Sequence, residues 1–109
     1  MKKSSWQTTA EVLDVIDGDT FRARLDLGWR ISLLVLVRVR GINAPEMTTD
    51  GGAAAREFLA RVLPPGTIVG INSRRLDKYG RSEADVTLPN GADLARQLLD
   101  SGHVVAMRR

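Results

Sequence analysis

The sequence predicts a mainly β (β+α) domain with two or three helices, built on a five-stranded Greek-key barrel. Three observations predict this fold class. Residues 10–40 alternate apolar and polar side chains between short turns, two later segments carry apolar residues at helical spacing, and two strand-like segments lie between those two. A five-stranded Greek-key barrel accommodates this order of three strands, a helix, two strands and a helix.

Residues 10–40 predict three consecutive strands. The first covers residues 10–16 and ends at an Asp-Gly-Asp turn, and the second, residues 20–27, alternates between apolar and charged side chains. Gly28 marks the next turn, and residues 29–40 form a long strand rich in aliphatic side chains. Strands joined by such short turns are typical of an antiparallel meander.

The rest of the chain predicts two helices and further strands, separated by polar, glycine-rich or proline-rich connections. Apolar residues at helical spacing indicate each helix, and a Pro-Pro-Gly sequence stops the first. In order, the predicted elements are an irregular segment at 41–52, a helix at 53–63, a strand at 67–72, a charged loop at 73–80, a strand at 81–88, a helix at 93–101 capped by Gly102, and a short strand at 103–107.

One domain accounts for the chain. Its 109 residues are enough for one core of modest size, and we expect residues 1–9 to form an N-terminal arm and residues 10–107 to form the domain. The absence of cysteine excludes a disulfide scaffold, cysteine-ligated zinc and thiol catalysis. The single histidine, His103, disfavours a Ser-His-Asp triad, and a structural role is the more frequent one for such a residue. Any chemistry must therefore use carboxylates, guanidinium groups and a metal held by oxygen.

The charge balance favours an anionic partner, but only weakly. Sixteen basic residues against thirteen acidic ones give a net charge of +3, and thirteen of the basic residues are arginines, whose planar fork suits phosphate. A bias toward arginine codons in GC-rich coding DNA is an alternative explanation. Lys2 and Lys3 precede no apolar segment typical of a signal peptide, and no apolar run approaches the ~20 residues of a membrane helix. We expect a cytoplasmic monomer without membrane contact.

Three short segments carry residues suited to phosphate and cation chemistry. Asp17-Gly18-Asp19-Thr20 places two carboxylates at the end of a strand, where they can hold a hard cation or form an ordinary turn. Arg38 lies in a strand and is followed by Pro45-Glu46, for which the ordinary alternatives are a solvated arginine and a surface acid. Residues 77–81, Asp-Lys-Tyr-Gly-Arg, join a second arginine to a tight turn that could equally be a hairpin loop.

Taken together and in this order, the three segments resemble the staphylococcal (thermonuclease-type) nuclease family. The resemblance runs from about residue 10 to residue 105 and also covers the order of strands and helices. It implies an OB-fold, which is a five-stranded barrel with helices packed on it. It also implies cleavage of phosphodiester bonds in DNA and RNA, typically with calcium and leaving 3′-phosphate ends.

The resemblance assigns the metal ligands residue by residue. Asp19 matches the carboxylate that binds the metal, Asn43 stands at the position of the second carboxylate, and Ala44 matches the residue that lends its backbone carbonyl. An aspartate is usual where this chain has Asn43. An amide oxygen can still bind calcium, but one negative charge is missing, so we expect one weakly bound calcium ion and slower turnover.

The resemblance also assigns the catalytic residues. Glu46 matches the glutamate proposed as general base for the attacking water, and Arg38 and Arg81 match the two arginines that hold the scissile phosphate. Two guanidinium groups and a divalent cation can stabilise the charge that builds on the phosphoryl oxygens. The outer-shell and substrate-binding residues that the resemblance implies are Asp17, Thr20, Asp77, Lys78 and Tyr79.

The sequence leaves three functions open. The first is an endonuclease of low sequence specificity that acts on DNA or RNA. The second is a catalytically weakened nucleic-acid-binding module, which Asn43 and the absence of base-packing tyrosines after Gly102 favour. The third is a protein–protein adaptor, which leaves the paired arginines and carboxylates unexplained. Trp6 and Trp29 could stack on bases, although packing in the core or at a sheet edge is the more frequent role.

Overall fold

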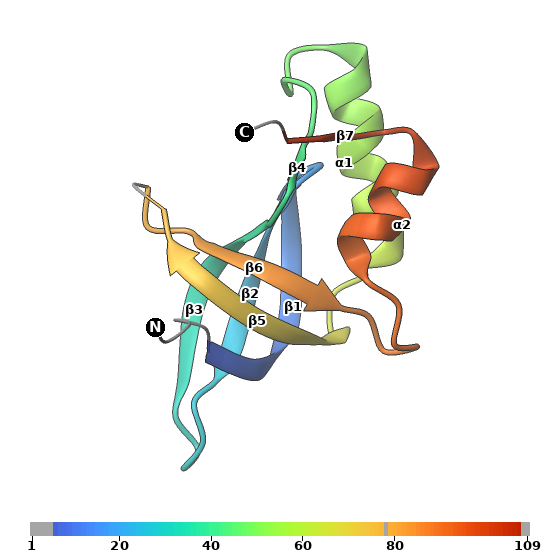
Figure 1. The fold of residues 1–109 in the computed structure, drawn as a ribbon. Coiled ribbons are helices and arrows are strands. Elements are labelled where there is room, and N and C mark those ends of the chain that lie inside the picture. Colours follow the sequence, from blue (N-terminus) through green and yellow to red (C-terminus); the bar gives the residue numbers. More distant parts are fainter. Residues whose placement is uncertain (1–5, 78, 108–109) are drawn as a thin grey trace, which may run out of the picture.

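A closed five-stranded barrel forms the body of the protein (Figure 1). The computed structural model describes residues 6–77 and 79–107. The barrel strands are β1 (Trp6–Asp17), β2 (Thr20–Asp26), β3 (Ser32–Val39), β5 (Ile68–Leu76) and β6 (Ser82–Thr87). The other elements are β4 (Ile42–Asn43), α1 (Asp50–Val62), α2 (Leu94–Ser101) and β7 (Val105–Ala106). The predicted fold class, mainly β with helices and a five-stranded barrel, is confirmed.

The barrel closes through one parallel pairing. β1, β2 and β3 form the predicted antiparallel meander, and β5 pairs antiparallel with both β1 and β6. β3 and β6 then run parallel from Val37 opposite Ser82 to Val39 opposite Ala84. This pairing brings the end of β3 next to the start of β6, two places that are far apart in the sequence. β4 and β7 pair separately, beside the barrel.

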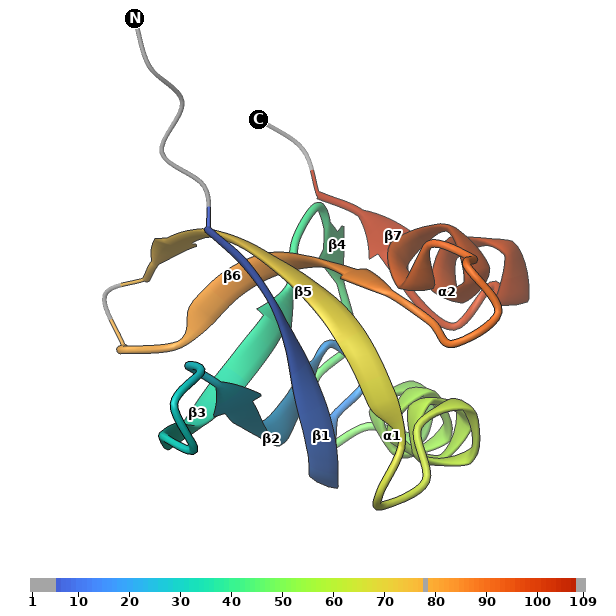
Figure 2. The same cartoon turned by 90° about the horizontal axis from the view of Figure 1, so that it is seen from below.

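Alternation along the strands builds the core. In β2, Phe21, Ala23 and Leu25 are buried whereas Arg22 and Arg24 are exposed, as the predicted strand requires. Both helices lie on the same side of the barrel (Figures 1 and 2). Each helix contributes at least one fully buried leucine to the core, so the helices complete a single hydrophobic core that the barrel begins.

Several elements are longer than local sequence patterns predict. Residues 6–9, assigned to the arm, belong to β1 and pair with β5, and residues 73–76, predicted as loop, continue β5 and pair largely with β6. α1 begins at Asp50 rather than at residue 53, because the Thr49 hydroxyl caps it by accepting from the Gly52 amide at 3.0 Å. β3 begins at Ser32 because residues 29 and 30 have positive φ angles and form the hairpin turn.

The aromatic residues divide between packed and exposed positions. The His103 ring lies 4.9 Å from the Phe58 ring, centroid to centroid, which agrees with a structural role. The packing expected for Trp29 is wrong, because this residue is 95% exposed at the tip of the β2–β3 hairpin. Neither helix of the described residues has the length and hydropathy needed to cross a membrane.

Candidate active site

The three sequence segments meet at one cleft. The cleft lies where the β1–β2 turn, the end of β3, the loop after β4 and the start of β6 come together. It has a volume of about 290 Å³. The residues that line it are Asp17, Asp19, Arg38, Asn43, Ala44, Pro45, Glu46, Met47 and Arg81. Among the predicted site residues that the structure describes, Thr20, Asp77 and Tyr79 contact this set from outside the cleft lining.

Arg38 is buried beneath the cleft and makes a dense set of polar contacts. Its Nη1 donates to the backbone carbonyls of Val39 and Ile42, both at 3.1 Å, and its Nη2 donates to the Asn43 side-chain oxygen. Nη2 also lies 3.5 Å from an Asp19 carboxylate oxygen. The alternative of a solvated strand arginine is therefore wrong: Arg38 connects β3 to β4 and to the β1–β2 turn.

Asp19 is the best-held carboxylate of the cleft. One oxygen accepts from the Thr20 hydroxyl at 2.9 Å and the other from the Ala44 amide at 3.0 Å. Burial by itself would raise the pKa of Asp19, but these hydrogen bonds, an interaction with Asp17 and the charge of Arg38 outweigh burial and lower the pKa. Asp19 is thus ionised at neutral pH and places a negative charge at the floor of the cleft.

Asp17 has the opposite behaviour. Its Oδ1 accepts from the Asp19 amide at 3.1 Å, which closes the turn. Burial is the largest cause that raises the pKa of Asp17, and together with the side-chain hydrogen bond and the negative charge of Asp19 it raises this pKa to about 6. Of these two carboxyl groups, Asp19 is therefore ionised at a pH at which Asp17 still binds a proton.

Glu46 is exposed at the rim of the cleft, directly after Pro45. Within the described part of the chain, its side chain makes no hydrogen bond or ion pair, whereas its backbone carbonyl accepts from the Thr49 amide and hydroxyl. The backbone at Glu46 is thus fixed by the helix cap while its carboxylate remains available to solvent or a ligand.

Arg81 enters the cleft from a turn that Asp77 organises. Asp77 accepts from the backbone amides of Tyr79 and Arg81 at 2.9 and 3.0 Å, and from Nε of Arg81 at 2.6 Å. Burial would raise the pKa of Asp77, but these donors outweigh it and lower the pKa. The Arg81 guanidinium carbon lies 5.1 Å from the exposed Tyr79 ring. Lys78, the remaining predicted residue of this turn, lies outside the described residues.

The profile of one protein family matches this chain over residues 36–109, about two thirds of its length. The family is described as "Staphylococcal nuclease homologue". The chain belongs to this family. The matched range includes Arg38, Asn43, Glu46 and Arg81, whereas the Asp17–Thr20 turn precedes it. No curated protein compared with the chain matches it.

The cleft contains oxygen atoms of the kinds that bind hard cations in proteins. Asp19 and Asn43 both approach Nη2 of Arg38, so a carboxylate and an amide oxygen lie close together, and Ala44 lines the same cleft. Such oxygens suit calcium. Within the described residues, however, no three His, Cys, Asp or Glu side chains gather as a metal site. Asp19 is the one carboxylate of this donor set and is paired with Arg38, so the set offers a cation little net negative charge.

Two glycines, Gly18 and Gly52, allow the segments of the cleft to pack closely, a role that local sequence patterns do not indicate. A Cβ at Gly18 would lie 2.6 and 2.8 Å from the Cβ atoms of Ala55 and Ala44, so only glycine lets the β1–β2 turn, α1 and the loop after β4 meet. A Cβ at Gly52 would overlap the backbone carbonyl of Glu46. The Thr-Asp-Gly-Gly sequence at 49–52 was the available signal, since a threonine N-cap predicts a helix start there.

Replacing Asp17 by asparagine tests whether folding raises the pKa of this carboxyl group. Since folding raises the pKa of Asp17 from 3.8 to about 6, the stability that its protonated form provides is present below about pH 4 and is lost as the pH rises through about 6. The free energy of unfolding of wild type minus that of Asp17→Asn should therefore decrease between about pH 4 and about pH 6. Urea titrations at a series of pH values measure this difference. Asp50→Asn, an exposed carboxylate on α1, is the control. A difference that stays flat or rises between these pH values contradicts the assignment.

The adjacent glycines of α1 provide a matched pair for the loop that carries Glu46. Gly52→Ala should lower the free energy of unfolding by about 1–3 kcal/mol, because the added methyl group forces the Glu46 backbone away. Gly51→Ala meets only ordinary contacts at 3.5 Å or more and should be neutral or stabilising by up to about 1 kcal/mol. Chemical denaturation measures both. Equal destabilisation by the two substitutions would show that the loop does not pack on the helix as described.

Proposed function

We propose that this protein is a nuclease that hydrolyses phosphodiester bonds within DNA or RNA chains, with calcium and with low sequence specificity. The observation that carries the proposal is the convergence of Arg38, Arg81, Asp19 and Glu46 on one cleft. Membership of the staphylococcal nuclease homologue family supports the same substrate class.

The two arginines would serve a phosphate differently. Asp77 holds Arg81 through Nε alone, which leaves both terminal nitrogens able to form a bidentate contact with phosphate. Arg38 is committed to four protein acceptors. It therefore acts mainly through its positive charge beneath the phosphate. Both charges would stabilise a pentavalent transition state more than the ground state, because negative charge increases on the phosphoryl oxygens as water attacks.

Glu46 is the group placed to act on the water. Its carboxylate lies at the rim of the same cleft and is not engaged by the described residues. A carboxylate within reach of a water beside the phosphorus can orient it and accept its proton as the new P–O bond forms. The leaving oxygen then departs on the side opposite the attack.

Calcium, when bound by Asp19, Asn43 and the Ala44 carbonyl, would supply a positive charge that offsets the carboxylates of the cleft and polarises the phosphate. The low sequence specificity follows from the character of the cleft. Its lining is polar and charged apart from Pro45, Met47 and the Ala44 methyl group. Contacts to phosphate position a nucleic acid but do not read its bases.

The second candidate function is a nucleic-acid-binding module without efficient cleavage. Asn43 favours it, because the amide contributes no charge toward a cation and is already hydrogen-bonded to Arg38. The discriminating observation is product formation: a binding module would retain an oligonucleotide without cutting it, with or without calcium.

Glu46→Gln tests the proposal. With a fluorescent single-stranded DNA or RNA and calcium, we expect wild type to cleave and Glu46→Gln to lose about 10²–10⁴-fold in kcat with little change in KM, because the amide cannot accept the proton. Glu57→Gln, at an exposed carboxylate of α1 that does not line the cleft, is the matched control and should cleave like wild type. Cleavage by Glu46→Gln at the wild-type rate refutes the base assignment, and wild type that binds without products supports the module.

A further inference from the structure

The β2–β3 hairpin leaves a strand edge unpaired. β3 pairs with β2 along its whole length, from Ser32 to Arg38, but its pairing with β6 covers only residues 37–39. Within the described residues, the backbone of residues 32–36 therefore has a partner on one side only. Figure 1 shows this end of the hairpin extending away from the helices.

The side chains around this edge are apolar and exposed. We define the hairpin patch as Leu27, Trp29, Ile31, Leu33 and Leu34, which are 38%, 95%, 56%, 50% and 61% exposed. From residue 31 to residue 37 the sequence Ile-Ser-Leu-Leu-Val-Leu-Val contains no charge and no proline. Natural edge strands usually carry a charge, a proline or a bulge that prevents pairing with another chain. This edge has none of these over residues 32–36.

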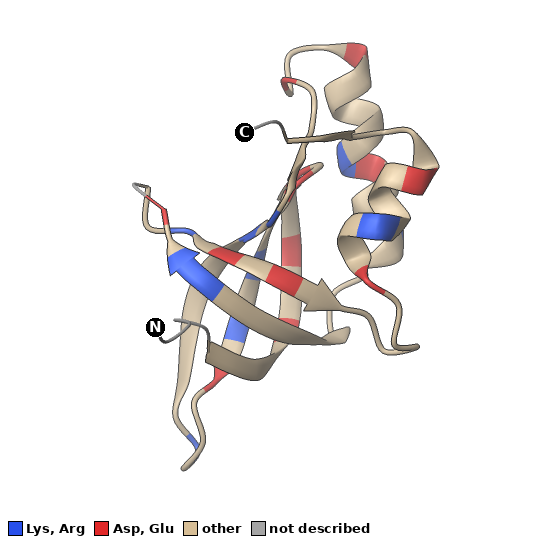
Figure 3. Cartoon of the chain, in the orientation of Figure 1, with Lys and Arg blue, Asp and Glu red and all other residues tan. Residues whose placement is uncertain are grey.

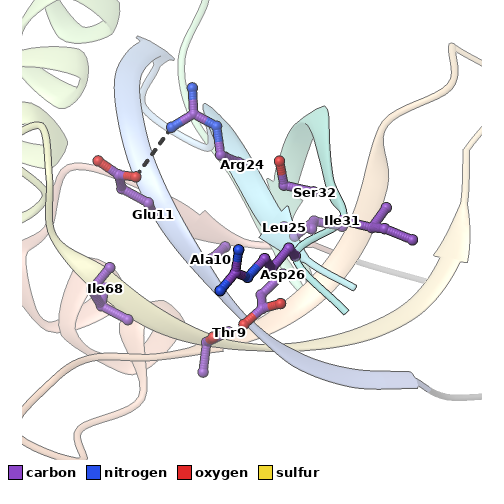
Figure 4. Close-up of a pocket in the computed structure, with 10 residues that line it drawn as sticks. Thr9, Ala10, Glu11, Arg24, Leu25, Asp26, Ile31, Ser32 and Ile68 are labelled. Atoms are coloured by element: carbon purple, nitrogen blue, oxygen red, sulfur yellow. Dashed lines mark hydrogen bonds and ion pairs between the residues drawn. The ribbon is translucent and has the colours of Figure 1, made fainter. Parts of the chain in front are cut away.

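Two arginines of β2 lie beside the β3 edge, and each forms an ion pair within the chain. Arg24, opposite Leu34 on β2, forms an ion pair with Glu11 at 3.2 Å, as Figure 4 shows beside a cleft that includes Ile31 and Ser32. Arg22, opposite Leu36, forms an ion pair with Asp14 at 3.0 Å. These two arginines are already paired within the chain, whereas Asp26, opposite Ser32, and Arg30 in the turn form no ion pair with the described residues. Residues 32–36 themselves form an uncharged strand edge with apolar side chains beside it.

We propose that the β3 edge and the hairpin patch form a symmetric dimer interface with a second copy of this chain. Antiparallel pairing of the two edges about Leu34 sets Ser32 opposite Leu36 and Leu33 opposite Val35 of the second copy. No charge meets a like charge, and the same residues serve both sides, as a two-fold interface requires. The pairing satisfies the free backbone groups of residues 32–36 and joins the two barrels through a continuous sheet.

The area of the patch agrees with a dimer. Taking typical areas for aromatic and aliphatic side chains at the observed exposures, the patch and its strand edge expose roughly 600 Å² per copy. Complete covering of this area on both copies would bury at most roughly 1,200 Å², which is the lower limit of a specific interface. We therefore expect a dimer with a dissociation constant in the micromolar range, on the order of 1–100 µM. The monomer expected from the sequence is then the species at low concentration.

Light scattering coupled to size exclusion, at loading concentrations from about 10 to about 500 µM, tests the dimer. Wild type should shift from the monomer mass toward twice that mass as the concentration rises. Leu34→Lys places two lysines opposite each other and should weaken the dimer at least about tenfold without unfolding the chain, since residue 34 is exposed. Leu76→Lys, at a similarly exposed β5 position outside the patch, is the matched control and should dimerise like wild type.

Hydrogen exchange gives a second readout. The amides of residues 32–36 that face away from β2 should gain protection as the dimer forms, and circular dichroism should show both lysine variants folded. A wild-type chain that is monomeric at every concentration overturns the proposal. The β3 edge would then be available only to a strand of a different protein. A dimer that Leu34→Lys does not weaken also overturns it. Neither result depends on nuclease activity, so the proposed function stands or falls separately.

Discussion

A buried guanidinium holds the site together. Arg38 reaches acceptors on its own strand, on the next strand and on the β1–β2 turn. A buried charge is costly unless it is paired and hydrogen-bonded, so the fold must supply these acceptors. Removing one partner of a buried pair typically costs about 3–5 kcal/mol, because the other charge is left uncompensated. The cleft therefore exists in this shape because Arg38 must be satisfied.

The two arginines of the site differ in how their guanidinium groups are held. Arg38 is held by several acceptors at the cleft, whereas Asp77 holds Arg81 through Nε and the backbone amide. The carboxylates divide in the same way. Asp19 is ionised and each of its carboxylate oxygens accepts a hydrogen bond, whereas Glu46 is exposed at the cleft. Figure 3 shows acidic and basic residues intermixed over the barrel strands, so the charge at the cleft depends on its local ion pairs more than on the net charge of the chain.

Much of the architecture could be predicted from the sequence because it depends on local patterns. The alternation in residues 20–26, the helical spacing near Leu59 and the glycine cap at Gly102 each act within one element, and each was found where predicted. The extra lengths of β1 and β5 were missed because they depend on pairing between distant strands. Local alternation says nothing about such partners.

The site followed the same rule. The order of the three motifs indicated that they converge, but the burial of Arg38 could not be predicted, since an arginine between two valines is normally the solvated side of a strand. The roles of Gly18 and Gly52 were also hidden, because the atoms that exclude a side chain there belong to other segments. The exposed hairpin patch is the converse case: its aliphatic residues predicted a strand, but the sequence did not show that they are exposed, because β3 pairs with β6 only over residues 37–39.

A double-mutant cycle between Arg38 and Asp19 tests the central claim most directly. Arg38→Met removes the charge while keeping an apolar stem, and Asp19→Asn keeps the shape of the carboxylate. If the buried guanidinium organises the cleft, the unfolding free energies of the single and double variants should give a coupling of about 1–3 kcal/mol. The exposed pair Arg22–Asp14 is the control and should couple by less than about 1 kcal/mol. A coupling between Arg38 and Asp19 no larger than that of the surface pair would contradict the account.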